Sequence, residues 1–121
     1  MTHVVDSELI TDAQRVAQWS QKLLTNADLT AEQHDDILAM SEAAHNFIAY
    51  AETEWTVIDG DAPQQDKQRV RHQLRNYLNI VVGFSKLLVK ELPDNLLLHM
   101  ATIRKIHTAG QKLMQRIEGI Q

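Results

Sequence analysis

One histidine in the second half of the chain has polar neighbours at helical spacing. The segment from His72 to Leu88 reads His-Gln-Leu-Arg-Asn-Tyr-Leu-Asn-Ile-Val-Val-Gly-Phe-Ser-Lys-Leu-Leu. At about 100° per residue, a helix here places His72, Asn76 and Asn79 on one polar face and the larger aliphatic residues on the opposite face. A neutral imidazole nitrogen is a good nucleophile near neutral pH. An exposed His72 could therefore accept a phosphoryl group from a second protein or domain.

This segment resembles the H-box of the dimerisation and phosphoacceptor domain (HisKA, or DHp) of sensor histidine kinases. The family motif is commonly His-Glu-Leu-Arg-Thr-Pro-Leu-Asn, followed by an apolar stretch with glycine, an aromatic residue and Leu-Leu. The residues that match it are His72, Leu74, Arg75, Leu78, Asn79, Gly83, Phe84, Leu87 and Leu88. The apolar rhythm of residues 103–117, around Ala109-Gly110 and Leu113, is similar to that of the family's second helix. The resemblance covers residues 69–120, less than half of the chain.

The resemblance implies a module of two-component signal transduction. In it, His72 is the phosphoacceptor, and the receiver domain of a response regulator docks beside it on Arg75, Tyr77 and Asn79. Asn76 stands where some family members have a polar residue that helps to dephosphorylate the partner, so it is expected to orient water. Gln73 replaces the family's acidic residue, and a neutral amide cannot act as a general base, a contribution typically worth about 10² to 10⁴ in rate.

The sequence contains no glycine-rich loop that could cradle phosphates, and it has no counterpart of the family's nucleotide-binding domain. We therefore expect no autonomous kinase activity and no cofactor, whereas a phosphotransfer or phosphatase role stays open. The alternative function is a non-catalytic dimerisation or adaptor scaffold with a degenerate phosphoacceptor site. A homodimer through the hairpin helices is a further option, because the family normally closes its bundle between two chains.

Helical spacing extends through the whole chain, because apolar residues recur at three and four positions and only four Gly and two Pro interrupt them. We expect a first helix from Ser7 or Asp12 to about Asn26. The capping box Thr30-Ala31-Glu32-Gln33 should start a second helix. A third should end at about Leu92, before Pro93, and a fourth should follow. The predicted fold is all-α, with antiparallel helical hairpins forming one four-helix bundle. Its parts are a hairpin at 1–58, a linker at 59–66 and the phosphoacceptor hairpin at 67–121.

The spacing also predicts which residues face the core. On the first helix these are Leu9, Ile10, Ala13, Val16, Ala17, Leu23 and Leu24, and on the second Ile37, Ser41, Ala44, Ile48, Ala51 and Trp55. On the third they are Val70, Leu74, Leu78, Val81, Leu88 and Leu92, and on the fourth Leu96, His99, Ile103, Ile106, Gly110, Leu113, Ile117 and Ile120. Lys22-Leu23-Leu24 echoes Lys86-Leu87-Leu88, and the stretch 43–48 echoes 109–114, so two related hairpins are plausible. Duplication and shared composition both explain this echo.

Composition limits the classes of function. The 121 residues carry a formal net charge of −4 with Lys and Arg scattered among acids, so we expect no nucleic-acid partner. The absence of cysteine leaves no disulfide or thiolate site. The N-terminus lacks the features of a signal peptide, and no apolar run approaches the roughly 18 residues of a membrane span, so we expect a cytoplasmic protein without a membrane partner.

The remaining histidines have no comparable context. His34, His45, His99 and His107 are expected to be surface or seam residues. Glu42 and His45 have the Glu-x-x-His spacing of di-iron bundles, but such a site needs two pairs and two further glutamates, so no metal site is expected. The aromatic residues are expected to lie in the core or at its edge: Trp19, Trp55, Tyr77 and Phe84.

Overall fold

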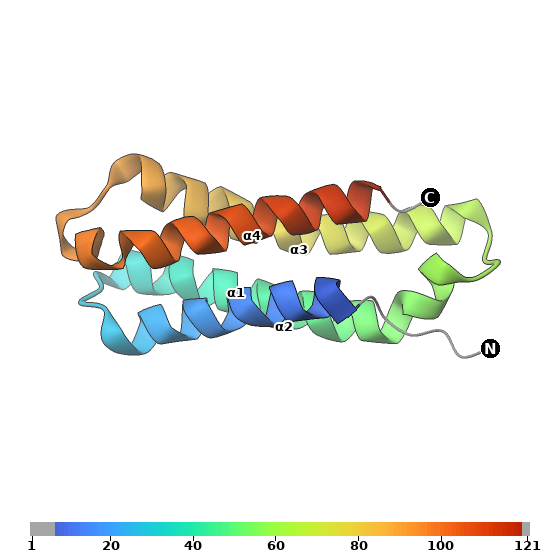
Figure 1. Ribbon diagram of the computed structural model, residues 1–121, viewed down its shortest axis with the longest axis horizontal. Helices are drawn as coiled ribbons and strands as arrows, with labels where there is room; N and C mark the ends of the chain where they lie inside the picture. The colour runs from blue at the N-terminus through green and yellow to red at the C-terminus, as the bar shows by residue number, and fades with distance from the viewer. Residues whose placement is uncertain (1–6, 120–121) are drawn as a thin grey trace.

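The structure of the protein is a computed structural model, and it describes residues 7–119. Its elements are α1 (Ser7–Asn26), α2 (Ala31–Asp59), α3 (Gln64–Glu91), the 3₁₀ helix η1 (Asp94–His99) and α4 (Met100–Glu118). The described residues contain no strand (Figure 1). The prediction of an all-α fold built from antiparallel hairpins is confirmed.

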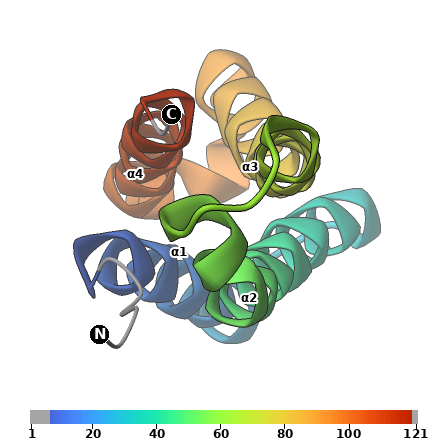
Figure 2. The same cartoon turned by 90° about the vertical axis from the view of Figure 1, so that its right-hand side faces the viewer.

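The four helices surround one elongated core in the order α1, α2, α3, α4 (Figure 2). Each helix packs on the next one in the chain, and α4 returns to pack on α1. Consecutive helices run in opposite directions, so α1 and α4 are also antiparallel (Figure 1). The described part of a single chain thus closes a four-helix bundle.

Local signals explain most helix boundaries. The Thr30 side chain accepts from the backbone N–H of Gln33, and the Gln33 side chain accepts from the backbone N–H of Thr30, which is the predicted capping box. The connection between the hairpins is shorter than the predicted linker, because α2 extends to Asp59 and α3 already begins at Gln64. Pro63 lies directly before α3, where its missing N–H costs no helical hydrogen bond.

The predicted core is largely confirmed, with differences where α3 passes into α4. Leu92 was expected in the core but is 45% exposed, because it caps α3 in the left-handed conformation with a φ of 46°. His99 is half-buried, and Met100 is buried in its place. The reason is the 3₁₀ helix η1, whose three residues per turn shift the register of the seam before α4 begins. Ile10, Leu24 and Ile48 are half-buried, and Ile120 lies outside the described residues.

The two hairpins bury corresponding positions. Buried residues of α1 and α3 match at one constant separation in sequence: Leu9 with Leu74, Ala13 with Leu78, Val16 with Val81, Ser20 with Ser85 and Leu23 with Leu88. The separation is one residue longer for α2 and α4: Ile37 with Ile103, Met40 with Ile106, Ala44 with Gly110, Phe47 with Leu113 and Ala51 with Ile117. By burial, Leu23 therefore corresponds to Leu88 rather than to Leu87, one residue away from the sequence echo. The bundle has an approximate internal two-fold relation that exchanges α1 with α3 and α2 with α4.

Candidate functional site

His72 lies on the outer face of α3, opposite the buried Leu74 and Leu78. Its side chain is exposed, as are those of Asn76 and Asn79 along the same face. This position agrees with the face predicted from helical spacing. The two leucines hold the helix by its apolar side, so the imidazole is presented to solvent without being part of the core.

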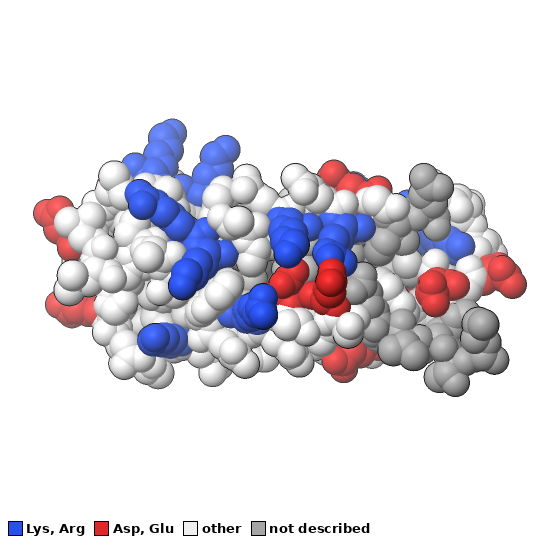
Figure 3. Space-filling model, viewed as in Figure 1, with Lys and Arg blue, Asp and Glu red and all other residues white. Residues whose placement is uncertain are grey.

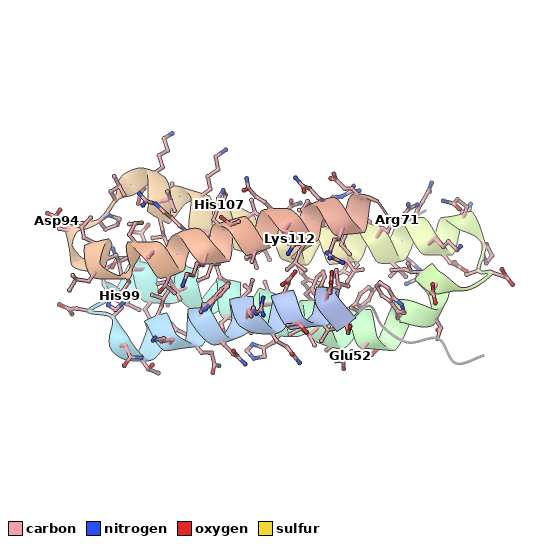
Figure 4. All side chains as sticks on the ribbon, viewed as in Figure 1. Glu52, Arg71, Asp94, His99, His107 and Lys112 are labelled. Atoms are coloured by element: carbon pink, nitrogen blue, oxygen red, sulfur yellow. The ribbon has the colours of Figure 1, made fainter. Side chains whose placement is uncertain are left out.

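Three arginines surround His72. A surface hollow of about 630 Å³ is lined by Gln65, Gln68, Arg69, Arg71, His72 and Arg75. Arg71 is labelled in Figure 4, on α3 near the end that follows the α2–α3 connection. Guanidinium groups offer planar, paired N–H donors that suit the oxygens of a phosphoryl group. The site combines a nucleophilic nitrogen with positive charge around it.

The residues expected to bind a partner lie on the outer face of α3 and on its two flanks. The Nε atom of Arg75 lies 4.0 Å from an Oε1 atom of Glu118 on α4, and it makes no hydrogen bond within the described part of the chain. Tyr77 instead packs edge-to-face on Tyr50 of α2, with ring centroids 6.1 Å apart. Arg75 and Tyr77 therefore flank the outer face of α3 on opposite sides. Gln73 is half-buried, whereas Asn79 is exposed between the flanks.

An apolar strip continues along α3 from the histidine. Ile80 is 38% exposed and Leu87 is 43% exposed, two and four turns beyond His72. Between them, Gly83 has no atom within 4 Å of the position where a Cβ would lie. Phe84, seven residues after Tyr77, is half-buried on the flank that faces α2. Exposed aliphatic residues beside an open glycine form a surface on which another helix could pack.

Charge is distributed unevenly between the two hairpins, contrary to the scattering expected from the sequence. Ten of the twelve Lys and Arg residues follow Pro63, whereas twelve of the sixteen Asp and Glu residues precede it. Helix α2 carries seven acidic residues and no Lys or Arg. Lys and Arg side chains gather on the face formed by α4 and α1 (Figure 3). The chain is acidic as a whole, but it has a basic side.

The other described histidines lie in different surroundings. Nδ1 of His45 donates to the carbonyl oxygen of Ser41 at 2.8 Å, and Nδ1 of His107 is hydrogen-bonded to Oγ of the buried Ser85 at 3.1 Å. Exposed His34 lies beside Asp35, with 3.8 Å between Nδ1 and Oδ1. Among residues 7–119 no three His, Asp or Glu side chains are grouped to hold a metal ion.

Arg69 and Arg71 were not predicted as residues of the site, although the sequence before His72 indicates them. Residues 67–72 read Lys-Gln-Arg-Val-Arg-His, and positions three and four residues apart on a helix share a side. Arg69 is three residues before His72, and Arg75 is three residues after it. The basic run directly before the histidine was therefore visible in the sequence.

Comparison with protein-family models, with curated proteins and with solved structures finds no match. No helix within residues 7–119 is both long and apolar enough to cross a membrane. The class defined by the fold and the site is thus a helical bundle that presents one histidine among arginines on an outer helix face.

Proposed function

We propose that the protein is a two-component signalling module that receives or relays a phosphoryl group at His72 and docks a receiver domain beside it. The observation that carries the proposal is the position of His72, exposed on α3 in a hollow lined by Arg69, Arg71 and Arg75. The hollows lined by His34 and by His45 contain no Lys or Arg. The likeness of residues 72–88 to the histidine-kinase H-box supports the same assignment.

The chemistry follows from these groups. A ring nitrogen of neutral His72 attacks the phosphorus of an aspartyl phosphate on the receiver, so that an N–P bond forms and the P–O bond to the aspartate breaks. The aspartate leaves as a carboxylate, and the second ring nitrogen releases its proton to water. The arginines offset the negative charge of the phosphoryl oxygens during transfer. A carboxylate is a good leaving group, so this step does not depend on the general base that Gln73 cannot supply.

The apolar strip supports docking. A receiver must bring its phosphoaspartate to His72 while resting on neighbouring surface, and Ile80, Gly83 and Leu87 offer apolar area and a gap on the same face of α3. Asn76 lies one turn from His72 on the same exposed face, and we assign it the role of orienting a water molecule toward the phosphorus. An adaptor would use the same surface without exchanging phosphate.

Chemical phosphorylation with phosphoramidate tests the acceptor without a partner protein. The parent chain should gain one acid-labile, base-stable phosphate, detected by mass spectrometry and ³¹P NMR. His72→Ala should lose that phosphate and keep its helicity and melting temperature, because exposed substitutions usually change stability by less than about 0.5 kcal/mol. His34→Ala is the matched control, since His34 is also exposed on a helix but has an aspartate as its neighbour. Equal labelling of parent and His72→Ala would refute the assignment.

The arginines are tested in the same reaction. Arg69→Gln combined with Arg71→Gln should slow labelling of His72 by about tenfold, because two charge-assisted contacts to the anionic reagent are lost. Lys86→Gln combined with Lys90→Gln removes two exposed cations of α3 away from the hollow and serves as the control matched in charge. Equal slowing by both changes would mean that only the overall charge of α3 matters.

A receiver domain separates relay from scaffold. With a phosphorylated receiver that binds the chain, the parent should take up phosphate. The Asn76→Ala variant should exchange phosphate normally, but hydrolysis of the phosphate on the receiver should be slower than with the parent. Binding that persists while no phosphate is exchanged would instead favour the adaptor function.

A further inference from the structure

The internal two-fold relation gives the bundle two corresponding grooves with different chemistry. It places the groove between α1 and α4 in correspondence with the groove between α3 and α2, which lies beside His72. The constant separations between matching buried residues also pair the exposed ones. By them, Arg15 corresponds to Ile80, Lys22 to Leu87, Lys105 to Ala39 and Lys112 to Asn46. Cationic residues of α1 and α4 thus stand where α3 and α2 have apolar or neutral residues.

The floor of the two grooves is similar. Trp19 corresponds to Phe84, and both aromatic side chains are half-buried at the edge of the core. Ala109 corresponds to Ala43, so a small residue lies on the facing helix in each groove. The α1/α4 groove therefore keeps an apolar floor of Trp19 and Ala109 between its charged sides.

The α1/α4 groove has a surplus of positive charge. A hollow of about 330 Å³ is lined by Asp12, Arg15, Trp19, Arg104, Lys105, Thr108, Ala109 and Lys112, which include four cations and one acid. Lys112 is labelled in Figure 4, on the middle of α4. The four cations are exposed, and Figure 3 shows this basic face. Like charges held close together repel each other, and an anionic partner would relieve that repulsion.

Asp12 positions two of these cations. Asp12 is 7% exposed. Its Oδ1 atom lies 3.6 Å from Nη1 of Arg15, and its Oδ2 atom lies 3.7 Å from Nζ of Lys112. Its Oδ2 atom makes no hydrogen bond within residues 7–119. The buried carboxylate is shared by cations of both helices, and it holds them at the edge of the groove.

We propose that the α1/α4 groove binds an acidic amphipathic helix of a partner protein. A groove between two antiparallel helices accepts a third helix, whose apolar residues would meet Trp19 and Ala109. From Arg104 to Lys112 the cations span eight residues, or about 12 Å, which is roughly two helical turns of a bound segment. On the bound helix, acidic residues three and four positions apart would face Arg15 of α1 on one side of the groove and Arg104 of α4 on the other. This site is separate from the surface beside His72 and does not depend on phosphate chemistry.

A synthetic helix provides the first test. The probe is a fluorescein-labelled helical peptide of sixteen residues, with leucine on one face and glutamate on the other. The control is the same peptide with lysine in place of glutamate. Binding is followed by anisotropy with the whole chain, and also by Trp19 emission in a Trp55→Phe variant, where Trp19 is the only tryptophan. The acidic peptide should bind, shift the Trp19 emission and weaken with added salt. The basic peptide should not bind.

Charge-reversed variants then locate the site. Lys105→Glu combined with Lys112→Glu should weaken binding by about tenfold or more, since each contact is replaced by repulsion. Lys86→Glu combined with Lys90→Glu makes the same change in net charge on α3 and should have little effect. No binding at low salt, equal weakening by both pairs, or unchanged Trp19 emission would overturn the proposal. Tighter binding of a single-stranded oligonucleotide of equal charge would overturn the assignment to an acidic helix.

Discussion

Gly110 lies at a close contact between α4 and α3, and its replacement tests the packing of the bundle. A Cβ atom at this position would lie 3.0 Å from Cγ2 of Val82 and 3.2 Å from Cγ1 of Val81. Both distances are shorter than ordinary van der Waals contact. Gly110→Leu adds three further carbons beyond that crowded first one, at a residue that is buried. The helices must therefore move apart, or the valines must leave their preferred rotamers.

Gly83 provides a matched control for this change. It also lies inside a long helix, but no atom lies within 4 Å of its Cβ position and the residue is exposed. Gly83→Leu should gain about 0.8 kcal/mol of stability, because leucine has a higher helix propensity than glycine. Gly110→Leu gains the same amount from propensity but loses about 1–3 kcal/mol, or more, by overpacking. The difference between the two variants isolates the cost of the contact with the valines.

Chemical denaturation followed by circular dichroism measures this difference. We expect Gly110→Leu to be less stable than Gly83→Leu by about 1–3 kcal/mol, with midpoints of thermal unfolding separated by roughly 4–12 °C for a domain of this size. The stability of Gly110→Ala should lie between those of the two leucine variants, because the valine methyl groups can yield by a few tenths of an ångström to admit one Cβ atom. Equal stability of the two leucine variants would show that Gly110 does not lie in a close helix contact, and the arrangement of α3 against α4 would be wrong.

Three further outcomes are expected. Leu92→Gly should stabilise the fold by about 1 kcal/mol, measured by urea unfolding, because Leu92 has a φ of 46° and glycine adopts this conformation without steric cost; a loss of stability would refute this. Burial raises the pKa of Asp36, and the nearby Glu32 and Asp35 carboxylates raise it further. Since the ionised form is disfavoured in the fold, Asp36→Asn should raise the melting temperature at pH 7, and the gain should fade as the pH is lowered and the carboxyl becomes protonated in the folded protein; a gain independent of pH would contradict the cause. Incubation with γ-³²P-ATP alone should leave the chain unlabelled, and label on the isolated chain would contradict this expectation.

Helical periodicity was sufficient to predict the fold class, because apolar residues recur at three and four positions along all four helices. The capping box at Thr30 and Pro93 after α3 are local features, so they could be interpreted without tertiary information. The 3₁₀ helix η1 could not be predicted in this way. It depends on how Leu96 and Met100 reach the core after the turn, and the apolar run at 96–98 fits an α-helix equally well. Leu92 was misplaced for the same reason, since its backbone conformation is determined by the turn.

The face of the candidate site was predictable, but its surroundings were only partly so. The shared exposed face of His72 and Asn76 follows from the angle between successive helical residues. That Arg75 lies near Glu118 while Tyr77 lies against Tyr50 required knowledge of which helix is on each side of α3. The basic α1/α4 groove brings together residues that are about ninety positions apart in sequence, so no local pattern indicates it. Counting charged residues in each hairpin reveals the uneven distribution of charge. The net charge of the whole chain does not show it.

Closure of the bundle within one chain explains how its two grooves could differ. In a symmetric homodimer, any substitution appears in both copies, so the two corresponding grooves must keep the same chemistry. Here the counterpart of His72 is Ser7, and the counterpart of Ile80 is Arg15, so the two outer faces carry different residues on similar cores. Matching buried positions keep the helices in register, whereas exposed positions are free to change because they contribute little to stability. A single chain of this kind can therefore present the histidine that we propose as acceptor on one side and a cationic groove on the other.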